Sequence, residues 1–222
     1  MFTTKILASS DPWHSREPIW IWQDSAALAT VVLLHGRGGG AERMITWAHE
    51  LMPAANLFAP QATEQTWYPY SFLRPTYENQ PYLDSALLHL GSVIELAMHE
   101  TEASPRNVIL LGFSQGACLL AEYLKRHPAR YGGAVIMSGG VIGDDTEVSG
   151  GVEQGLDSMP VYLGCDAHDP HIPFDRLELT AQQLGMAGAS MIMATYADFG
   201  HRPHPDATRF ARGLVAEMYN AD

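Results

Sequence analysis

Basic residues are scarce in this 222-residue chain, which holds 13 Lys and Arg against 25 Asp and Glu and carries a formal net charge of −12. Proteins that bind nucleic acid or an anionic membrane surface usually present clusters of Lys and Arg to the phosphates. The composition therefore argues against both classes of partner. A strongly anionic small molecule would also gain no general attraction from this chain.

Cysteine and long apolar runs are scarce as well. The two cysteines, Cys118 and Cys165, have no spacing typical of a metal site, and we expect both to be free thiols, as in a reducing compartment. No apolar run approaches the roughly 18 residues that a membrane span needs. The first residues, Met1–Lys5, lack the build of a signal peptide. The expectation is a soluble cytoplasmic protein without stable membrane association.

The sequence also lacks repeats, linkers and low-complexity tracts, and short apolar runs instead alternate with amphipathic segments. Strands are expected at residues 2–8, 18–23, 31–34, 57–60, 108–111, 134–138, 161–165 and 191–196. Helices are expected at residues 41–52, 83–100, 117–127, 175–184 and 207–219. This alternation predicts a mostly parallel, doubly wound α/β sheet with helices on both faces, in a single domain over residues 1–222. A chain of this length leaves no room for a large lid.

The most informative stretch is Gly112-Phe113-Ser114-Gln115-Gly116, which lies between the expected strand 108–111 and a helix. Gly-x-Ser-x-Gly in that context is typical of a nucleophile elbow, in which the serine occupies a strained turn. The two glycines would leave room for such a turn. Ser114 would then lie at a helix N-terminus, where N–H groups favour negative charge. The alternative is a Gly-rich turn in which the serine only caps the helix.

A second glycine-rich stretch, His35–Gly40, follows the strand expected at 31–34. Its four glycines allow a close approach of backbone to ligand, as in an oxyanion-hole loop, although simple flexibility is the alternative. The long irregular segment 61–82 is rich in aromatic residues. Irregular segments of this length are often functional. We expect the substrate pocket to be lined by Trp67, Tyr68 and Phe72, with core packing as the alternative for each.

A serine nucleophile requires a base and an acid that orients it. Both should follow strands, because the loops beyond the carboxyl ends of parallel strands face one crevice. The residues alone leave two candidates for each role: Asp166 or Asp169 as the acid, and His201 or His204 as the base. His168 and His171 lie nearby, but no metal-type spacing connects these histidines, so no metal and no cofactor is expected.

Four motifs in this order resemble one family over about 170 residues: Leu34-His35-Gly36-Arg37-Gly38, Gly112-Phe113-Ser114-Gln115-Gly116-Ala117, Asp169-Pro170-His171-Ile172-Pro173 and Gly200-His201. The chain resembles the phospholipase/carboxylesterase branch of the α/β-hydrolases, which includes acyl-protein thioesterases. The resemblance implies Asp169 as the acid and His201 as the base. It also implies oxyanion donors at the backbone N–H groups of Arg37 and Gln115.

The sequence departs from that family after the first motif. Familiar members carry Gly-Asp where this chain has Gly38-Gly39, and Arg37 stands where a small or apolar residue is common. The resemblance therefore does not predict the shape of the acyl pocket.

The resulting hypothesis is a serine carboxylesterase that hydrolyses short- to medium-chain esters of small molecules through Ser114, His201 and Asp169 and an acyl-enzyme. A thioesterase or lysophospholipase would use the same triad, and a non-catalytic ligand-binding scaffold is the alternative from another class. Whether the chain forms a homodimer stays open.

Overall fold

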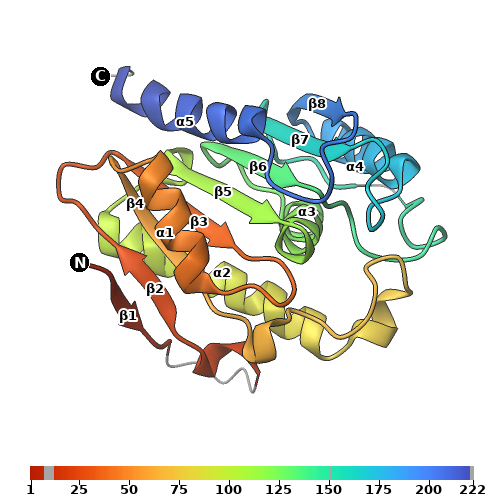
Figure 1. Cartoon of the computed structure of the whole chain (residues 1–222), viewed down its shortest axis with the longest axis horizontal. Helices are drawn as coiled ribbons and strands as arrows, with labels where there is room; N and C mark the ends of the chain where they lie inside the picture. Colours follow the sequence, from red (N-terminus) through yellow and green to blue (C-terminus); the bar gives the residue numbers. More distant parts are fainter. Residues whose placement is uncertain (8–12, 151, 221–222) are drawn as a thin grey trace.

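The protein is described here by a computed structural model that covers residues 1–7, 13–150 and 152–220. Within these ranges, eight strands form one sheet in the order β1-β2-β4-β3-β5-β6-β7-β8 (Figure 1). At one edge, β2 (Ile19–Trp22) runs antiparallel to both of its neighbours, and all other neighbouring strands are parallel. The other strands are β1 (Thr3–Lys5), β3 (Ala29–Leu34), β4 (Ala55–Pro60), β5 (Val108–Phe113), β6 (Gly133–Met137), β7 (Pro160–Asp166) and β8 (Ser190–Tyr196).

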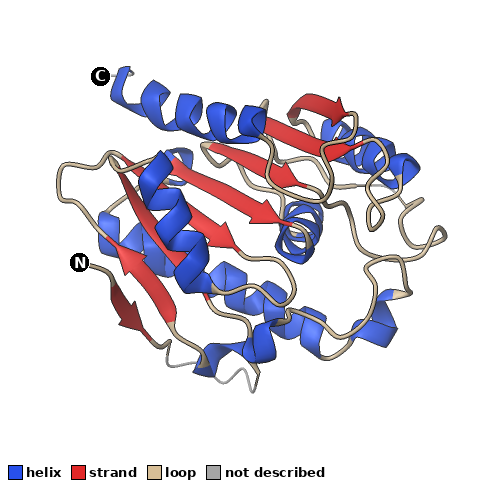
Figure 2. Ribbon diagram, viewed as in Figure 1, coloured by secondary structure: helices blue, strands red, loops and turns tan. Residues whose placement is uncertain are grey.

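Helices cover both faces of this sheet (Figure 2). They are α1 (Ala41–Leu51), α2 (Tyr82–Thr101), α3 (Gln115–Arg126), α4 (Phe174–Met186) and α5 (Pro205–Asn220). Four short 3₁₀ turns complete the described structure: η1 (His14–Arg16), η2 (Thr63–Gln65), η3 (Thr76–Asn79) and η4 (Pro105–Asn107). The predicted mostly parallel, doubly wound sheet is confirmed, and within the described ranges no helices form a separate lid.

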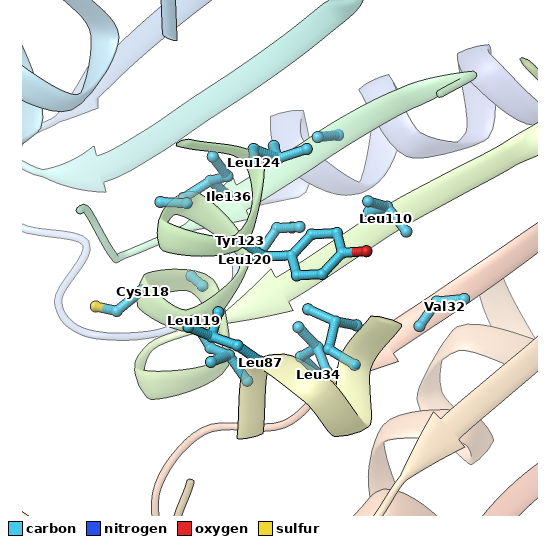
Figure 3. Packing of buried hydrophobic residues seen from close by; sticks show 14 of the residues in the cluster. Val32, Leu34, Leu87, Leu110, Cys118, Leu119, Leu120, Tyr123, Leu124 and Ile136 are labelled. Carbon is cyan, nitrogen blue, oxygen red and sulfur yellow. The ribbon is translucent and has the colours of Figure 1, made fainter. Parts of the chain in front are cut away.

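The central strands are apolar on both sides, and successive residues supply two separate cores. Val32 and Leu34 of β3 face α2, α3 and α4, whereas Val31 and Leu33 face α1 and α5. This division follows from the strand period of two, and continuous apolar runs are what a strand buried on both faces requires. Figure 3 shows part of the first core, in which Leu119 and Leu120 of α3 pack with Leu87 of α2 and Leu110 of β5.

Every strand and helix expected from the sequence overlaps one in the structure, and most differ by one or two residues at their ends. The largest difference is the strand expected at 2–8. Only Thr3–Lys5 pairs with β2, because β1 is an exposed edge strand of polar residues with little apolar surface to bury. The last residue of that expected strand, Ala8, lies outside the described residues.

The parallel strands all end at the same edge of the sheet, so the loops that follow β3, β5, β7 and β8 lie together there. The candidate catalytic residues lie on these loops, and the candidate pocket residues Trp67, Tyr68 and Phe72 lie on the segment after β4. None of the helices in residues 1–7, 13–150 and 152–220 is both long and apolar enough to cross a bilayer.

Candidate active site

Ser114 lies on a sharp turn between β5 and α3, with φ 54° and ψ −119°. This backbone region is strained for a residue with a side chain, and the turn is tied to β6 by the Ser114 N–H, which donates to the carbonyl of Met137 at 2.9 Å. A Cβ atom at Gly112 would lie 2.5 Å from the Gly116 carbonyl oxygen, and one at Gly116 would lie 2.4 Å from that of Leu34. Only glycine fits either position, which is why both flank the serine.

Three side chains from separate loops form one hydrogen-bonded chain at this edge. His201 Nε2, beyond β8, lies 2.8 Å from Ser114 Oγ, beyond β5. His201 Nδ1 lies 2.7 Å from Oδ2 of Asp169, beyond β7. With Nδ1–H donating to the carboxylate, Nε2 is left to accept the proton of the serine hydroxyl.

The Asp169 carboxylate is enclosed, and its side chain has no exposed surface. Burial alone would raise its pKa, but hydrogen bonds from His201 and the His171 N–H outweigh this, and the pKa lies below the usual aspartate value. Its Oδ1 accepts the N–H of His171 at 2.8 Å and of Ile172 at 3.3 Å, while the Cys165 thiol donates to Oδ2 at 3.5 Å. Asp169 is therefore an anion beside His201.

Asp166, the other aspartate considered from the sequence, has a different set of partners. Its Oδ1 accepts the His168 N–H at 2.8 Å, and its Oδ2 accepts the N–H groups of Phe199 and Gly200, the latter at 2.7 Å. These bonds, led by that from Gly200, hold the pKa of Asp166 below its usual value. Its oxygens thus face main-chain N–H groups, while Asp169 faces the histidine ring.

Two further histidines near the site, His171 and His204, make different ring contacts. His171 places its ring edge-on to that of His201, at 4.8 Å between centroids, and His204 stacks on Tyr196. In the described part of the chain, no three His, Cys, Asp or Glu side chains are grouped as metal ligands.

The glycine-rich loop 35–40 passes directly against the serine. A Cβ atom at Gly36 would lie 3.1 Å from that of Ser114. His35 anchors this loop, because its Nδ1–H donates to the Gly36 carbonyl at 2.8 Å and its Nε2 accepts the Ala62 N–H at 3.1 Å. Burial lowers the pKa of His35, which agrees with this neutral form. His35 is therefore a structural residue of the loop.

The backbone N–H groups of Arg37 and Gln115 belong to the two segments next to Ser114. Arg37 lies in the glycine-rich loop 35–40, and Gln115 is the residue after Ser114. Among the hydrogen bonds of the described residues, neither N–H donates to a protein acceptor. Gln115 is also the first residue of α3, where N–H groups and the helix dipole favour an anion. Both N–H groups are thus left without a protein acceptor among the described residues, and their part in an oxyanion hole stays a prediction.

The side chains of Arg37 and Gln115 make contacts that the sequence did not reveal. The Arg37 guanidinium donates to the carbonyls of Tyr68, Pro69 and Tyr70 at 2.8–2.9 Å. The Gln115 amide accepts the Trp67 N–H at 3.0 Å and donates to the Tyr68 carbonyl at 2.7 Å. Both side chains thus fix the 61–82 segment to the loops that flank the serine.

A cleft of about 490 Å³ opens above Ser114 and His201. Its lining residues are Arg37, Tyr68, Pro69, Tyr70, Ser71, Phe72, Ser114, Gln115, Cys118, His171, Ile172 and His201. Two of the three aromatic residues expected in the pocket, Tyr68 and Phe72, are among them. Burial raises the pKa of the Cys118 thiol to about 12, so the cleft wall is neutral there.

The expectation that Trp67 lines the pocket is wrong. Its side chain is fully buried, its indole N–H donates to the His35 carbonyl at 2.8 Å, and its ring packs against that of His35. Trp67 therefore supports the glycine-rich loop from behind. An irregular segment has no period from which to predict which of two neighbouring aromatics faces the cleft.

A mostly parallel sheet with serine, aspartate and histidine on the loops after β5, β7 and β8 defines the class of α/β-hydrolases. A model of the phospholipase/carboxylesterase family matches residues 20–216, and the chain belongs to this family. It is therefore a hydrolase of the carboxylesterase type, acting on ester bonds. No curated protein matches the chain in sequence.

Several solved structures share this fold. A phospholipase/carboxylesterase from Dyadobacter fermentans is 29% identical, covers 97% of this chain and 96% of its own, and superposes with a TM-score of 0.80. The esterase PE8 is 22% identical over 91% of this chain and 98% of its own, with a TM-score of 0.71. A carboxylesterase from Mesorhizobium loti, at 17% identity, 96% and 98% coverage and a TM-score of 0.70, shares the fold.

Proposed function

We propose that the protein is a serine carboxylesterase in which Ser114 is the nucleophile, His201 the general base and Asp169 the residue that orients His201. The observation that carries this proposal is the chain of short hydrogen bonds from Asp169 through His201 to Ser114, of which Ser114 and His201 line the cleft. Ser114 attacks the ester carbonyl as His201 Nε2 takes its proton, and the Asp169 carboxylate stabilises the imidazolium that forms.

The oxyanion of the tetrahedral intermediate is held by the N–H groups of Arg37 and Gln115. Removing one such donor typically raises the barrier by about 3–4 kcal/mol. His201 then protonates the leaving alcohol, and the acyl group stays on Ser114. A water molecule, deprotonated by His201, releases the carboxylic acid and restores the serine. Each step uses groups of this chain and water.

The cleft favours short- to medium-chain, uncharged acyl groups. Phe72 and Ile172 supply apolar surface to its wall, and such side chains bind apolar ligand atoms. No helices of the described residues form a separate lid over the cleft, so a long chain would leave methylene groups in water. The guanidinium of Arg37 is already bound to three carbonyl oxygens and is not directed to a substrate carboxylate.

The mechanism is tested with Ser114→Ala, which should abolish ester hydrolysis and labelling by a fluorophosphonate, read as an intact-mass shift. Asp169→Asn should lower kcat by about 10⁴-fold, because the histidine takes the wrong tautomer. Ser92→Ala is the matched control, since its hydroxyl only donates to the Leu88 carbonyl within α2. More than a few per cent of wild-type activity in Ser114→Ala would reject the proposal.

Substrate range is tested by kcat/KM for p-nitrophenyl esters from acetyl to palmitoyl and for the matching thioesters. The proposal expects an optimum at short or medium chains and a preference for oxygen esters. A clear optimum at palmitoyl, or faster turnover of thioesters, would replace this substrate class while leaving the mechanism intact.

A further inference from the structure

Asp166, the last residue of β7, binds the main chain of two loops at once. Its side chain is buried, with a relative exposure of 5% for the residue. One oxygen accepts the N–H of His168, in the loop that carries Asp169. The other accepts the N–H groups of Phe199 and Gly200, in the loop that carries His201. One carboxylate therefore connects the acid loop to the base loop.

The base loop has an unusual backbone where it meets this carboxylate. Asp198 has φ 57° and Gly200 has φ 81°, both in the left-handed region. Successive N–H groups next to such residues point to one place and form a concave anion site. The Asp166 carboxylate occupies this site, and His201 is the next residue of the chain. The direction in which the His201 ring leaves the main chain thus depends on a turn that Asp166 holds.

The two aspartates divide the support of His201 between them. Asp169 binds the ring at Nδ1, and Asp166 binds the main chain from which the ring projects. A second contact between the loops, from the Ala167 N–H to the Tyr196 carbonyl at 2.7 Å, lies at the ends of β7 and β8 and does not reach the turn. The carboxylate therefore binds the main chain of residues 199–200 to the acid loop, whereas the other contacts described between these loops involve the His201 ring or the strand ends.

We propose that Asp166 is a positioning residue, which sets the distance between His201 and its partners Asp169 and Ser114 by holding the turn at Phe199 and Gly200. This inference rests on the proposed function for its kinetic consequence, although the geometric part stands by itself. Asp166 touches neither the substrate nor Ser114 and acts only through His201.

The test is Asp166→Asn, which keeps the size of the side chain but replaces one acceptor oxygen by an N–H₂ group. Either orientation of the amide turns a donor toward a main-chain N–H, because both oxygens are used. A displacement of the base near 1 Å can cost as much as about 100-fold in rate. We expect kcat per active site, counted by fluorophosphonate titration, to fall by about 10- to 100-fold with KM within twofold.

Asp144→Asn is the matched control. The Asp144 carboxylate likewise accepts main-chain N–H groups, those of Thr146 and Glu147, but Asp144 is not among the residues that line the cleft. Its kcat should stay within twofold of wild type. An unchanged kcat per titrated site in Asp166→Asn, or an equal loss in Asp144→Asn, would overturn the proposal.

A double variant separates positioning from a general loss of structure. In a His201→Ala background, Asp166→Asn should cost nothing more, because the group through which it acts is absent. A further loss of the same size would overturn the proposal. Crystal structures of wild type and Asp166→Asn give a readout without activity: the separation of His201 Nδ1 and Asp169 Oδ2 should exceed hydrogen-bond reach in the variant. An unchanged separation in the variant would reject the positioning role of Asp166. An inactive wild-type protein would instead reject only the proposed function.

Discussion

Gly116 and Gly213 are both helical glycines, but their surroundings are opposite. A Cβ at Gly116 would lie 2.4 Å from the Leu34 carbonyl oxygen and 2.6 Å from that of His35, both main-chain atoms, while one at Gly213 meets nothing within 4 Å. We expect Gly116→Ala to destabilise the fold by about 1–3 kcal/mol through overpacking, and Gly213→Ala to stabilise it by up to about 1 kcal/mol. Urea unfolding measures both changes, and equal stabilities for the two variants would contradict this steric account.

Asp166 and Asp169 also predict a stability that depends on pH. The folded-state pKa of each lies below the unfolded value, through main-chain N–H groups for Asp166 and, for Asp169, through His201 and His171 against the opposing effect of burial. Their contribution is present above the unfolded pKa of about 3.9 and is lost as the pH falls through the folded pKa. We expect the double variant Asp166→Asn/Asp169→Asn to be less stable at neutral pH.

The same double variant should lose less stability on acidification than wild type, because two of the groups that take up protons on unfolding are gone. Urea midpoints measured from neutral pH down through about pH 4 and below test this against the linkage relation. Parallel acid declines for wild type and the variant would show that these two carboxylates do not contribute.

At the scale of the elements, the 61–82 segment is held by side chains from other parts of the chain. It contains two short 3₁₀ turns and is fixed at its centre by the Arg37 guanidinium and the Gln115 amide. Arg37→Ala keeps the main-chain N–H but leaves the Pro69 and Tyr70 carbonyls without this donor, whereas the Tyr68 carbonyl keeps its bond from the Gln115 amide. We expect kcat/KM for neutral esters to fall by about tenfold as the cleft wall loses its position, and limited proteolysis to cut this segment faster.

Arg74→Ala is the control for that prediction, since Arg74 lies in the same segment but pairs only with Glu78 at the exposed surface. It should match wild type in both measurements. A loss in Arg37→Ala confined to esters that carry a carboxylate would instead make Arg37 an anion receptor.

Some elements of this fold can be predicted from the sequence, and others cannot. Strands such as β3 and β5 are buried on both faces and therefore read as continuous apolar runs, and the elbow needs glycine at two fixed positions, so both leave a local signature. The hydrogen-bond partners of Asp166, Arg37 and Trp67 leave no such signature in the sequence. They join segments 30 or more residues apart through main-chain groups, which every residue type carries. The residues alone could therefore not separate Asp166 from Asp169, and they misplaced Trp67.

At the scale of the whole molecule, the net charge of −12 acts on any charged substrate that approaches the cleft. The one arginine in the cleft wall, Arg37, is bound to carbonyl oxygens and stays beside the segment that it holds. An ester with a terminal carboxylate should therefore meet net repulsion, and its kcat/KM should lie below that of a neutral ester of equal length.

Salt provides the test of this repulsion, because the Debye length falls from about 30 Å at about 0.01 M to about 10 Å at about 0.1 M. Over that range kcat/KM should rise severalfold for the anionic ester and stay constant for the neutral one, since only the approach of a charge is screened. Arg37→Ala should show the same ratio between low and high salt, because the field comes from the whole surface rather than from one side chain. A kcat/KM that falls with salt for the anionic ester would mean that a local cation attracts it, and the cleft would then have to be assigned to anionic esters.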